Sequence, residues 1–107
     1  MIAVVLRDDM PACVRWEILM HERFSDVWIC KDLGRATTRA DPAELGRAAL
    51  AAYLAGRDSR GETFRVVVRT DHATDVVITA DQLTDPDGEA DPAVRQALPV
   101  YLRNALT

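Results

Sequence analysis

Strand-like and helix-like patterns of apolar residues compete in the N-terminal part of the chain. Residues 2–6 are apolar and largely β-branched, and the polar, proline-containing residues 8–11 follow them, which predicts a strand and then a turn. Over residues 13–24, apolar side chains alternate as in a strand, yet several also fall at helical spacing. We favour a strand, because residues 26–31 follow after a short break and would complete a hairpin.

The predicted hairpin places both tryptophans on one face. A turn centred on Arg23 would set Ile18 opposite Trp28 and Trp16 opposite Cys30. We expect the tryptophans to form a core beneath a helix, since aromatic side chains carry large apolar surfaces. The alternative is an exposed aromatic surface that binds a partner.

The clearest helix signal is the sequence Asp-Pro-Ala-Glu that begins at Asp41. The carboxylate of Asp41 can accept free N–H groups of the first turn, and Pro42 suits the first helical position because it has no N–H to lose. Glu44 stands where a capping box places its acid, and Gly56 is expected to end the helix. The apolar stripe of this helix consists of Leu45, Ala49, Ala52 and Tyr53.

The C-terminal half predicts a second hairpin and a second helix. Residues 64–70 and 75–80 read as two strands joined by a four-residue turn, and the first of them alternates arginine with apolar residues. An acidic loop over 81–91 follows. A helix then begins at an Asp-Pro pair, and Pro99 is expected to kink or break it.

Composition and element order together define the fold class. The chain has 107 residues, of which 49% are hydrophobic and 28% charged, as in ordinary globular proteins. A domain typically takes about 100–200 residues, so residues 1–107 are expected to form a single domain. The order of elements predicts an α+β fold with a mainly antiparallel sheet of about four to five strands and two helices packed on one face.

The distribution of charge restricts the kinds of partner. The net charge is -4, and residues 1–60 contribute nine basic and nine acidic side chains, so the whole deficit lies in residues 61–107. Much of it comes from Asp85, Asp87 and Glu89. Nucleic-acid binding depends on clustered Lys and Arg, so an acidic chain without a basic run is not expected to bind nucleic acid.

The cellular compartment follows from the absence of targeting signals. The N-terminal residues lack the basic segment and the long apolar run of a signal peptide, and no stretch is long enough for a membrane helix. Only Cys13 and Cys30 are present, and the predicted hairpin sets them on opposite faces, so no disulfide is expected. We therefore expect a cytoplasmic protein that binds no membrane.

No catalytic, metal or cofactor motif is recognised. Two cysteines and two histidines have the right number for a zinc site, but no pair has the short spacing such sites use. Asp71 and Asp75 flank one of these histidines and could polarise its ring, although turn chemistry explains all three residues as well. The four zinc candidates are Cys13, His21, Cys30 and His72.

One stretch resembles a known family. Residues 32–34 (Asp-Leu-Gly), followed by residues 41–45 (Asp-Pro-Ala-Glu-Leu) and the alanine-rich residues 48–54, look like the strand–loop–helix unit of HicB-type antitoxins. The resemblance covers about a quarter of the chain and lacks the proline of the family's usual loop. It implies a small acidic domain that pairs with a basic toxin.

We therefore expect a small, acidic, non-enzymatic domain that binds another protein, as immunity proteins, antitoxins, inhibitors and adaptors do. The partner is expected to be basic, because the acidic loop would contact it through Asp85, Asp87 and Glu89. Any exposed part of Trp16 or Trp28 would add affinity.

The alternative function belongs to a different class. It is a dimeric α+β domain that encloses a small-molecule or enzymatic pocket between sheet and helices, lined by Trp16, Trp28, His21 and Cys30. Homodimerisation through the last helix or an edge strand is compatible with either function.

Overall fold

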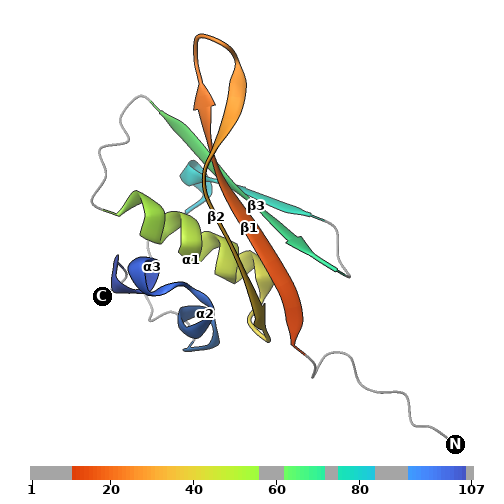
Figure 1. The fold of residues 1–107 in the computed structure, drawn as a ribbon. Helices are drawn as coiled ribbons and strands as arrows, with labels where there is room; N and C mark the ends of the chain where they lie inside the picture. The colour runs from red at the N-terminus through yellow and green to blue at the C-terminus, as the bar shows by residue number, and fades with distance from the viewer. Residues whose placement is uncertain (1–10, 56–61, 72–74, 84–91, 106–107) are drawn as a thin grey trace, which may run out of the picture.

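A four-stranded antiparallel sheet with three α-helices packed on one of its faces forms the fold (Figure 1). The computed structural model describes residues 11–55, 62–71, 75–83 and 92–105. The strands lie in the order β2-β1-β3-β4, and every neighbouring pair is antiparallel. This confirms the predicted α+β class; the strand expected over residues 2–6 lies outside the described residues.

The first two strands form a long hairpin that extends beyond the helices (Figure 1). β1 spans Ala12–Glu22 and β2 spans Val27–Thr38, so the strand interpretation is confirmed over the helical one for residues 13–22, while residues 23 and 24 belong to the turn. The apolar residues of β1 alternate between a buried and a partly exposed face, as the period of a strand requires.

The predicted register of this hairpin is wrong. Trp16 pairs with Gly34, and Trp28 pairs with His21, because the turn is centred between Phe24 and Ser25 rather than on Arg23. The shift near the turn is an odd number of residues, and such a shift moves side chains to the other face of the sheet. The two tryptophans therefore lie on opposite faces: Trp16 is 1% exposed in the core, and Trp28 lies on the face away from the helices.

A β-bulge changes the register again in the middle of the hairpin. Ile18 pairs with Asp32 and Leu19 pairs with Cys30, so Lys31 has no partner in β1. The two cysteines consequently share one face, contrary to the expectation of opposite faces, and both remain free thiols.

Helix α1 spans Pro42–Leu54, and the predicted N-cap at Asp41 and first-turn position of Pro42 are confirmed, whereas Glu44 does not complete the predicted capping box. The carboxylate of Asp41 accepts a hydrogen bond from the Ala43 N–H at 3.2 Å, while Glu44 pairs with Arg47 on the helix surface. The last helical residue is Leu54, two residues before the expected terminator Gly56, which lies outside the described residues.

The second hairpin is confirmed. β3 spans Thr63–Thr70 and β4 spans Val76–Thr79, and a short 3-10 helix, η2, continues the chain over Ala80–Gln82. β3 also pairs with β1, so the hairpins join into one sheet with β1 and β3 at its centre.

The C-terminal helix is divided at the predicted proline. α2 spans Pro92–Ala97 and α3 spans Val100–Ala105, with Pro99 between them. The side chain of Arg103 closes the break, because its guanidinium donates to the carbonyls of Arg95 and Leu98, each at 3.0 Å. These hydrogen bonds satisfy backbone carbonyl groups that have no helical N–H partner at the break.

The hydrophobic core lies between the sheet and the helices. It combines every second residue of β1 and β3 with the apolar stripe of α1 and one apolar side of α2 and α3. None of the helices in the described ranges combines the length and apolar character needed to cross a bilayer. The largest fully buried side chains are Trp16, Ile18, Leu45, Leu50, Leu98, Val14, Val66 and Val68.

Candidate functional site

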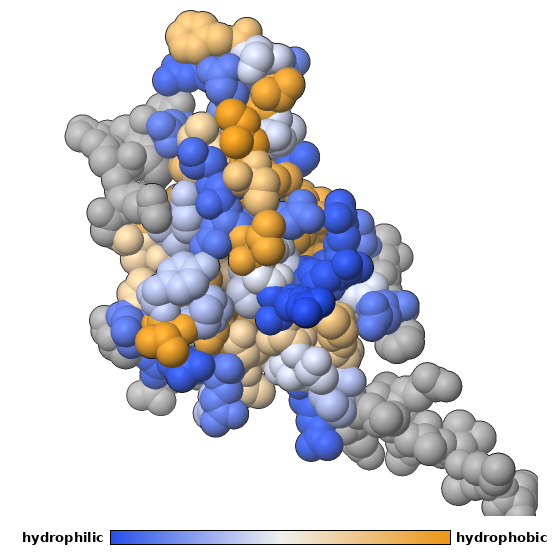
Figure 2. All heavy atoms as spheres, viewed as in Figure 1, coloured by the Kyte–Doolittle hydropathy of each residue, from blue (hydrophilic) through white to orange (hydrophobic). Residues whose placement is uncertain are grey.

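One face of the sheet has no described helix or strand packed over it, and we call it the open face. All core residues of β1 and β3 point the other way, toward the helices. Figure 2 shows strongly hydrophilic side chains gathered over the strands on the side away from the helices. The residues of the open face are Cys13, Arg15, Glu17, Leu19 and His21 of β1, Trp28, Cys30, Leu33, Arg35 and Thr37 of β2, Thr63, Arg65, Val67 and Arg69 of β3, and Val77 and Thr79 of β4.

Three arginines form a row across three neighbouring strands of the open face. Arg15 of β1 pairs directly with Arg35 of β2 on one side and with Arg69 of β3 on the other. All three side chains are exposed. Like charges directly opposite each other repel across a strand pair, so this arginine row stores unfavourable electrostatic energy.

The carboxylates that pair with the arginine row in the described ranges both bind Arg69. Glu17 accepts from Arg69 at 3.3 Å, and Asp75 accepts from the same guanidinium at 3.1 Å. Arg15 and Arg35 form no ion pair with another residue in the described ranges. Two of the three cations in the row are therefore available to an external anion.

An apolar row lies next to the arginine row. Leu33, Glu17, Val67 and Val77 are cross-strand neighbours on β2, β1, β3 and β4, so three of the four positions are aliphatic. Leu33 is 67% exposed and Val77 is 49% exposed, whereas Val67 is buried among its neighbours. The open face thus presents cations and aliphatic side chains side by side.

Trp28 and its neighbours form a separate cluster nearer the hairpin turn. The guanidinium of Arg65 lies 3.9 Å from the centroid of the Trp28 ring, within the range of a cation–π interaction. The ring of His21 contacts Trp28 at a centroid distance of 5.2 Å, and its Nε2 bonds Asp26 at 2.6 Å. Arg65 and His21 cover part of the indole ring, so Trp28 is half-buried although no described helix lies over it.

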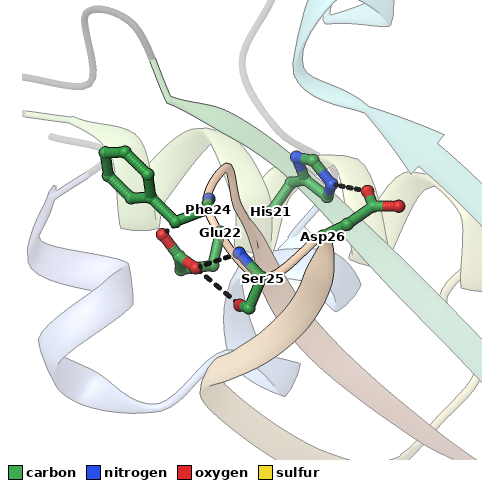
Figure 3. A network of polar contacts seen from close by, with 5 residues as sticks. All are labelled: His21, Glu22, Phe24, Ser25 and Asp26. Carbon is green, nitrogen blue, oxygen red and sulfur yellow. Dashed lines mark hydrogen bonds and ion pairs between the residues drawn. The ribbon is translucent and has the colours of Figure 1, made fainter.

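The turn between β1 and β2 is fixed by one carboxylate (Figure 3). Glu22 accepts hydrogen bonds from the Phe24 N–H at 3.1 Å, from the Ser25 N–H at 2.8 Å and from the Ser25 hydroxyl. The hydroxyl bond, followed by the two backbone bonds, holds the pKa of Glu22 below its usual 4.5. Asp26 closes the turn with a left-handed φ of 55°.

The tip of the hairpin exposes apolar side chains. Phe24 points away from the Glu22 network and is fully exposed (Figure 3). Val27 and Ile29 follow on β2, 48% and 39% exposed, and pair with Glu22 and Met20 on the side of the strands that faces the helices elsewhere. This apolar tip is separate from the open face.

The structure places the predicted contact residues in different environments. Trp16 is buried beneath Gly34 and presents no exposed surface to a partner, while Trp28 reaches the open face. Asp85, Asp87 and Glu89 lie outside the described residues, so their contact with a basic partner stays a prediction.

The residues of the alternative pocket are not brought together. Trp16 lies in the core, whereas Trp28, His21 and Cys30 lie on the open face, so these four side chains do not line a cavity between sheet and helices. The Cys30 thiol donates to the Asp32 carbonyl at 3.5 Å. The described part of the chain contains no group of three or more His, Cys, Asp or Glu placed to hold a metal ion, and His72 lies outside it.

The arginine row was missed in the sequence because it exists only once the strands are paired. Arg65 and Arg69 alternate with apolar residues, which correctly indicated a polar face on that strand. Arg15 and Arg35 are 20 positions apart and form no basic run in the sequence. Only the register of the sheet aligns them with Arg69.

Comparison of the chain with protein-family models, with characterised proteins and with solved structures finds no match. The resemblance to HicB-type antitoxins is therefore not supported by a family model.

Proposed function

We propose that this domain acts by binding another protein, as immunity proteins, antitoxins, inhibitors and adaptors do, and that the open face is its contact surface. The proposed partner-binding surface therefore lies on β1, β2, β3 and β4, and not on the acidic loop and Trp16. We propose no catalytic activity for the domain itself.

The observation that carries the proposal is the exposure of aliphatic side chains within a charged sheet face. Leu33 of β2 is 67% exposed and lies two residues from Arg35 of the arginine row. Val77 of β4 is 49% exposed. Burying one such side chain fully is worth about 1.5–3 kcal/mol. A partner that covers the apolar row gains this energy, and the surrounding charges form the polar rim that protein interfaces commonly have.

Cytoplasmic location and bacterial origin belong to the same proposal. Cys13 and Cys30 are both free thiols, and Cys30 is exposed, which suits a reducing compartment. The arginine-rich composition, with Lys31 as the single lysine, suits a bacterium with a GC-rich genome.

Affinity capture with matched variants tests the contact surface. The protein is immobilised and exposed to native lysate from the cells that make it, beside the variant Leu33→Thr/Val77→Thr. Threonine preserves strand propensity and removes exposed aliphatic surface from the apolar row. Val100→Thr is the control, because Val100 is 63% exposed on α3, away from the open face.

We expect the same partner with the wild-type protein and with Val100→Thr, and a loss of that partner with Leu33→Thr/Val77→Thr. Equal capture by all three proteins, or loss with Val100→Thr alone, would overturn the assignment of the open face. Circular dichroism of each variant confirms that the sheet is intact.

A further inference from the structure

We propose that the partner segment bound by the open face is acidic and aliphatic, and that Arg15 and Arg35 bind its carboxylates. This inference rests on the proposed function and names the chemistry of the partner. It runs against the net charge of the chain, which is -4 and by itself favours a basic partner.

Repulsion within the arginine row is the first argument. Arg15 has a like charge directly opposite it on both neighbouring strands, and neither it nor Arg35 has a carboxylate partner in the described ranges. An anion placed over the row is attracted by the guanidinium groups of Arg15 and Arg35 and also relieves their mutual repulsion. Guanidinium groups bind carboxylates in a two-bond geometry that lysine cannot copy.

The spacing of the two rows is the second argument. Neighbouring strands lie about 4.8 Å apart, and rows two residues apart along a strand lie about 6.7 Å apart. A segment that crosses the strands can therefore set acidic side chains over the arginine row and apolar side chains over Leu33 and Val77. The apolar row would contribute affinity, and the arginine row would select for acidic partners and speed their association.

The surroundings favour a protein segment over a nucleic acid. Single-stranded nucleic acids bind through bases stacked on free aromatic rings, together with a cationic groove. Among the open-face residues, Trp28 is the single Phe, Tyr or Trp. The guanidinium of Arg65 lies over its ring, so this ring is not free for a base to stack on.

Fluorescence anisotropy with three labelled probes tests the inference. The first probe is a peptide of repeated Glu-Glu-Leu triplets, the second replaces every Glu by Gln, and the third is an oligothymidylate. The test variant is Arg15→Gln/Arg35→Gln, which leaves Arg69 paired with Glu17 and Asp75. The control, Arg23→Gln/Arg95→Gln, removes the same charge from the hairpin turn and from helix α2.

We expect the acidic peptide to bind the wild-type protein and the control variant alike, and the test variant about tenfold more weakly. The Gln peptide should bind weakly, and raising the ionic strength should weaken the acidic peptide's binding. Arg15→Gln alone repeats the test with a single change at the centre of the row.

Two results would overturn the inference. One is acidic-peptide binding that is undetectable at low ionic strength or indifferent to the arginine row. The other is tighter binding of the oligothymidylate through the same arginines, which would indicate a nucleic-acid partner. A lysate partner that depends on Leu33 and Val77 while the peptide fails would leave the proposed function standing and refute the acidic segment.

Discussion

Gly34 of β2 lies directly against the indole ring of Trp16 of β1, so closely that a Cβ atom built on Gly34 would overlap the ring. Trp16 is 1% exposed and packed on its other sides by core residues. The ring therefore has no space into which it can move, and glycine is required at this position by close approach.

We predict that Gly34→Ala lowers the free energy of unfolding by about 1–3 kcal/mol, the usual range for overpacking a filled core. Denaturant unfolding followed by tryptophan fluorescence measures the change. Thr37→Ala, an exposed position on the same strand, is the control and should change stability far less. A neutral Gly34→Ala would show that β2 moves freely away from β1.

Gly46 has a similar role where α1 meets the sheet. A Cβ atom there would overlap a methyl group of Val68, whose β-branched side chain has little rotational freedom. Alanine should gain about 1 kcal/mol from helix propensity, yet we predict that Gly46→Ala is destabilising because the clash outweighs this gain. In a Val68→Ala background the same substitution should become less harmful or favourable. Equal effects in both backgrounds would contradict the clash.

Tyr101 of α3 donates its hydroxyl to both carboxylate oxygens of Asp32 in β2, at 2.9 and 2.7 Å. Partial burial, followed by the bond to Asp32 and its charge, raises the pKa of Tyr101 to about 12 from the ordinary 10.0. Because the folded pKa is the higher one, the interaction stabilises the fold fully below the ordinary value, and this contribution disappears as pH rises toward about 12.

We therefore predict that Tyr101→Phe is less stable than the wild type at neutral pH and that the difference narrows as pH rises above about 10. Denaturant unfolding at several pH values measures the difference, and the phenolate absorbance of the two proteins reports the ionisation of Tyr101. A difference that does not change with pH would contradict the role of the hydroxyl.

The turn at Glu22 should respond to acid. Its lowered pKa means that the ionised carboxylate stabilises the turn above the ordinary value of 4.5, and the stabilisation is lost as pH falls through the lower folded value. Ser25→Ala removes the hydroxyl bond, the largest cause of the shift. We predict that the pKa of Glu22, measured by NMR titration, rises toward 4.5 in this variant. An unchanged pKa would contradict the hydroxyl's role.

Neutralising the centre of the arginine row should stabilise the unliganded protein. We predict that Arg15→Gln raises the free energy of unfolding by a few tenths to about 1 kcal/mol at low salt, because two like-charge pairs disappear. The gain should fade at high salt, where exposed charges are screened. Arg23→Gln makes the same change in net charge at the hairpin turn and should show no gain. Equal gains from both variants would contradict repulsion within the row.

The type of each element could be predicted from the sequence, since alternation and helix caps are local signals. Asp41 and Pro42 marked the start of α1, and Pro99 marked the break between α2 and α3. These signals come from residues close together in the chain, so they can be recognised without knowledge of any tertiary contact.

The register of the first hairpin could not be predicted in the same way. It depends on hydrogen bonds around Glu22 that lengthen the turn, and on the unpaired Lys31. Apolar alternation in β1 did not reveal that Trp28 pairs with His21. The arginine row could not be predicted for the same reason, because only the register of the sheet aligns Arg15, Arg35 and Arg69.

The bulge at Lys31 also governs how the edge of the sheet meets other molecules. β2 is the longer of the two edge strands of the described sheet and spans 12 residues, a length that would favour the addition of another strand along it. The extra residue interrupts the regular spacing of free N–H and C=O groups, and its exposed ammonium would have to be desolvated by any incoming backbone. The domain can therefore present a broad open face while its longest edge resists strand addition and aggregation.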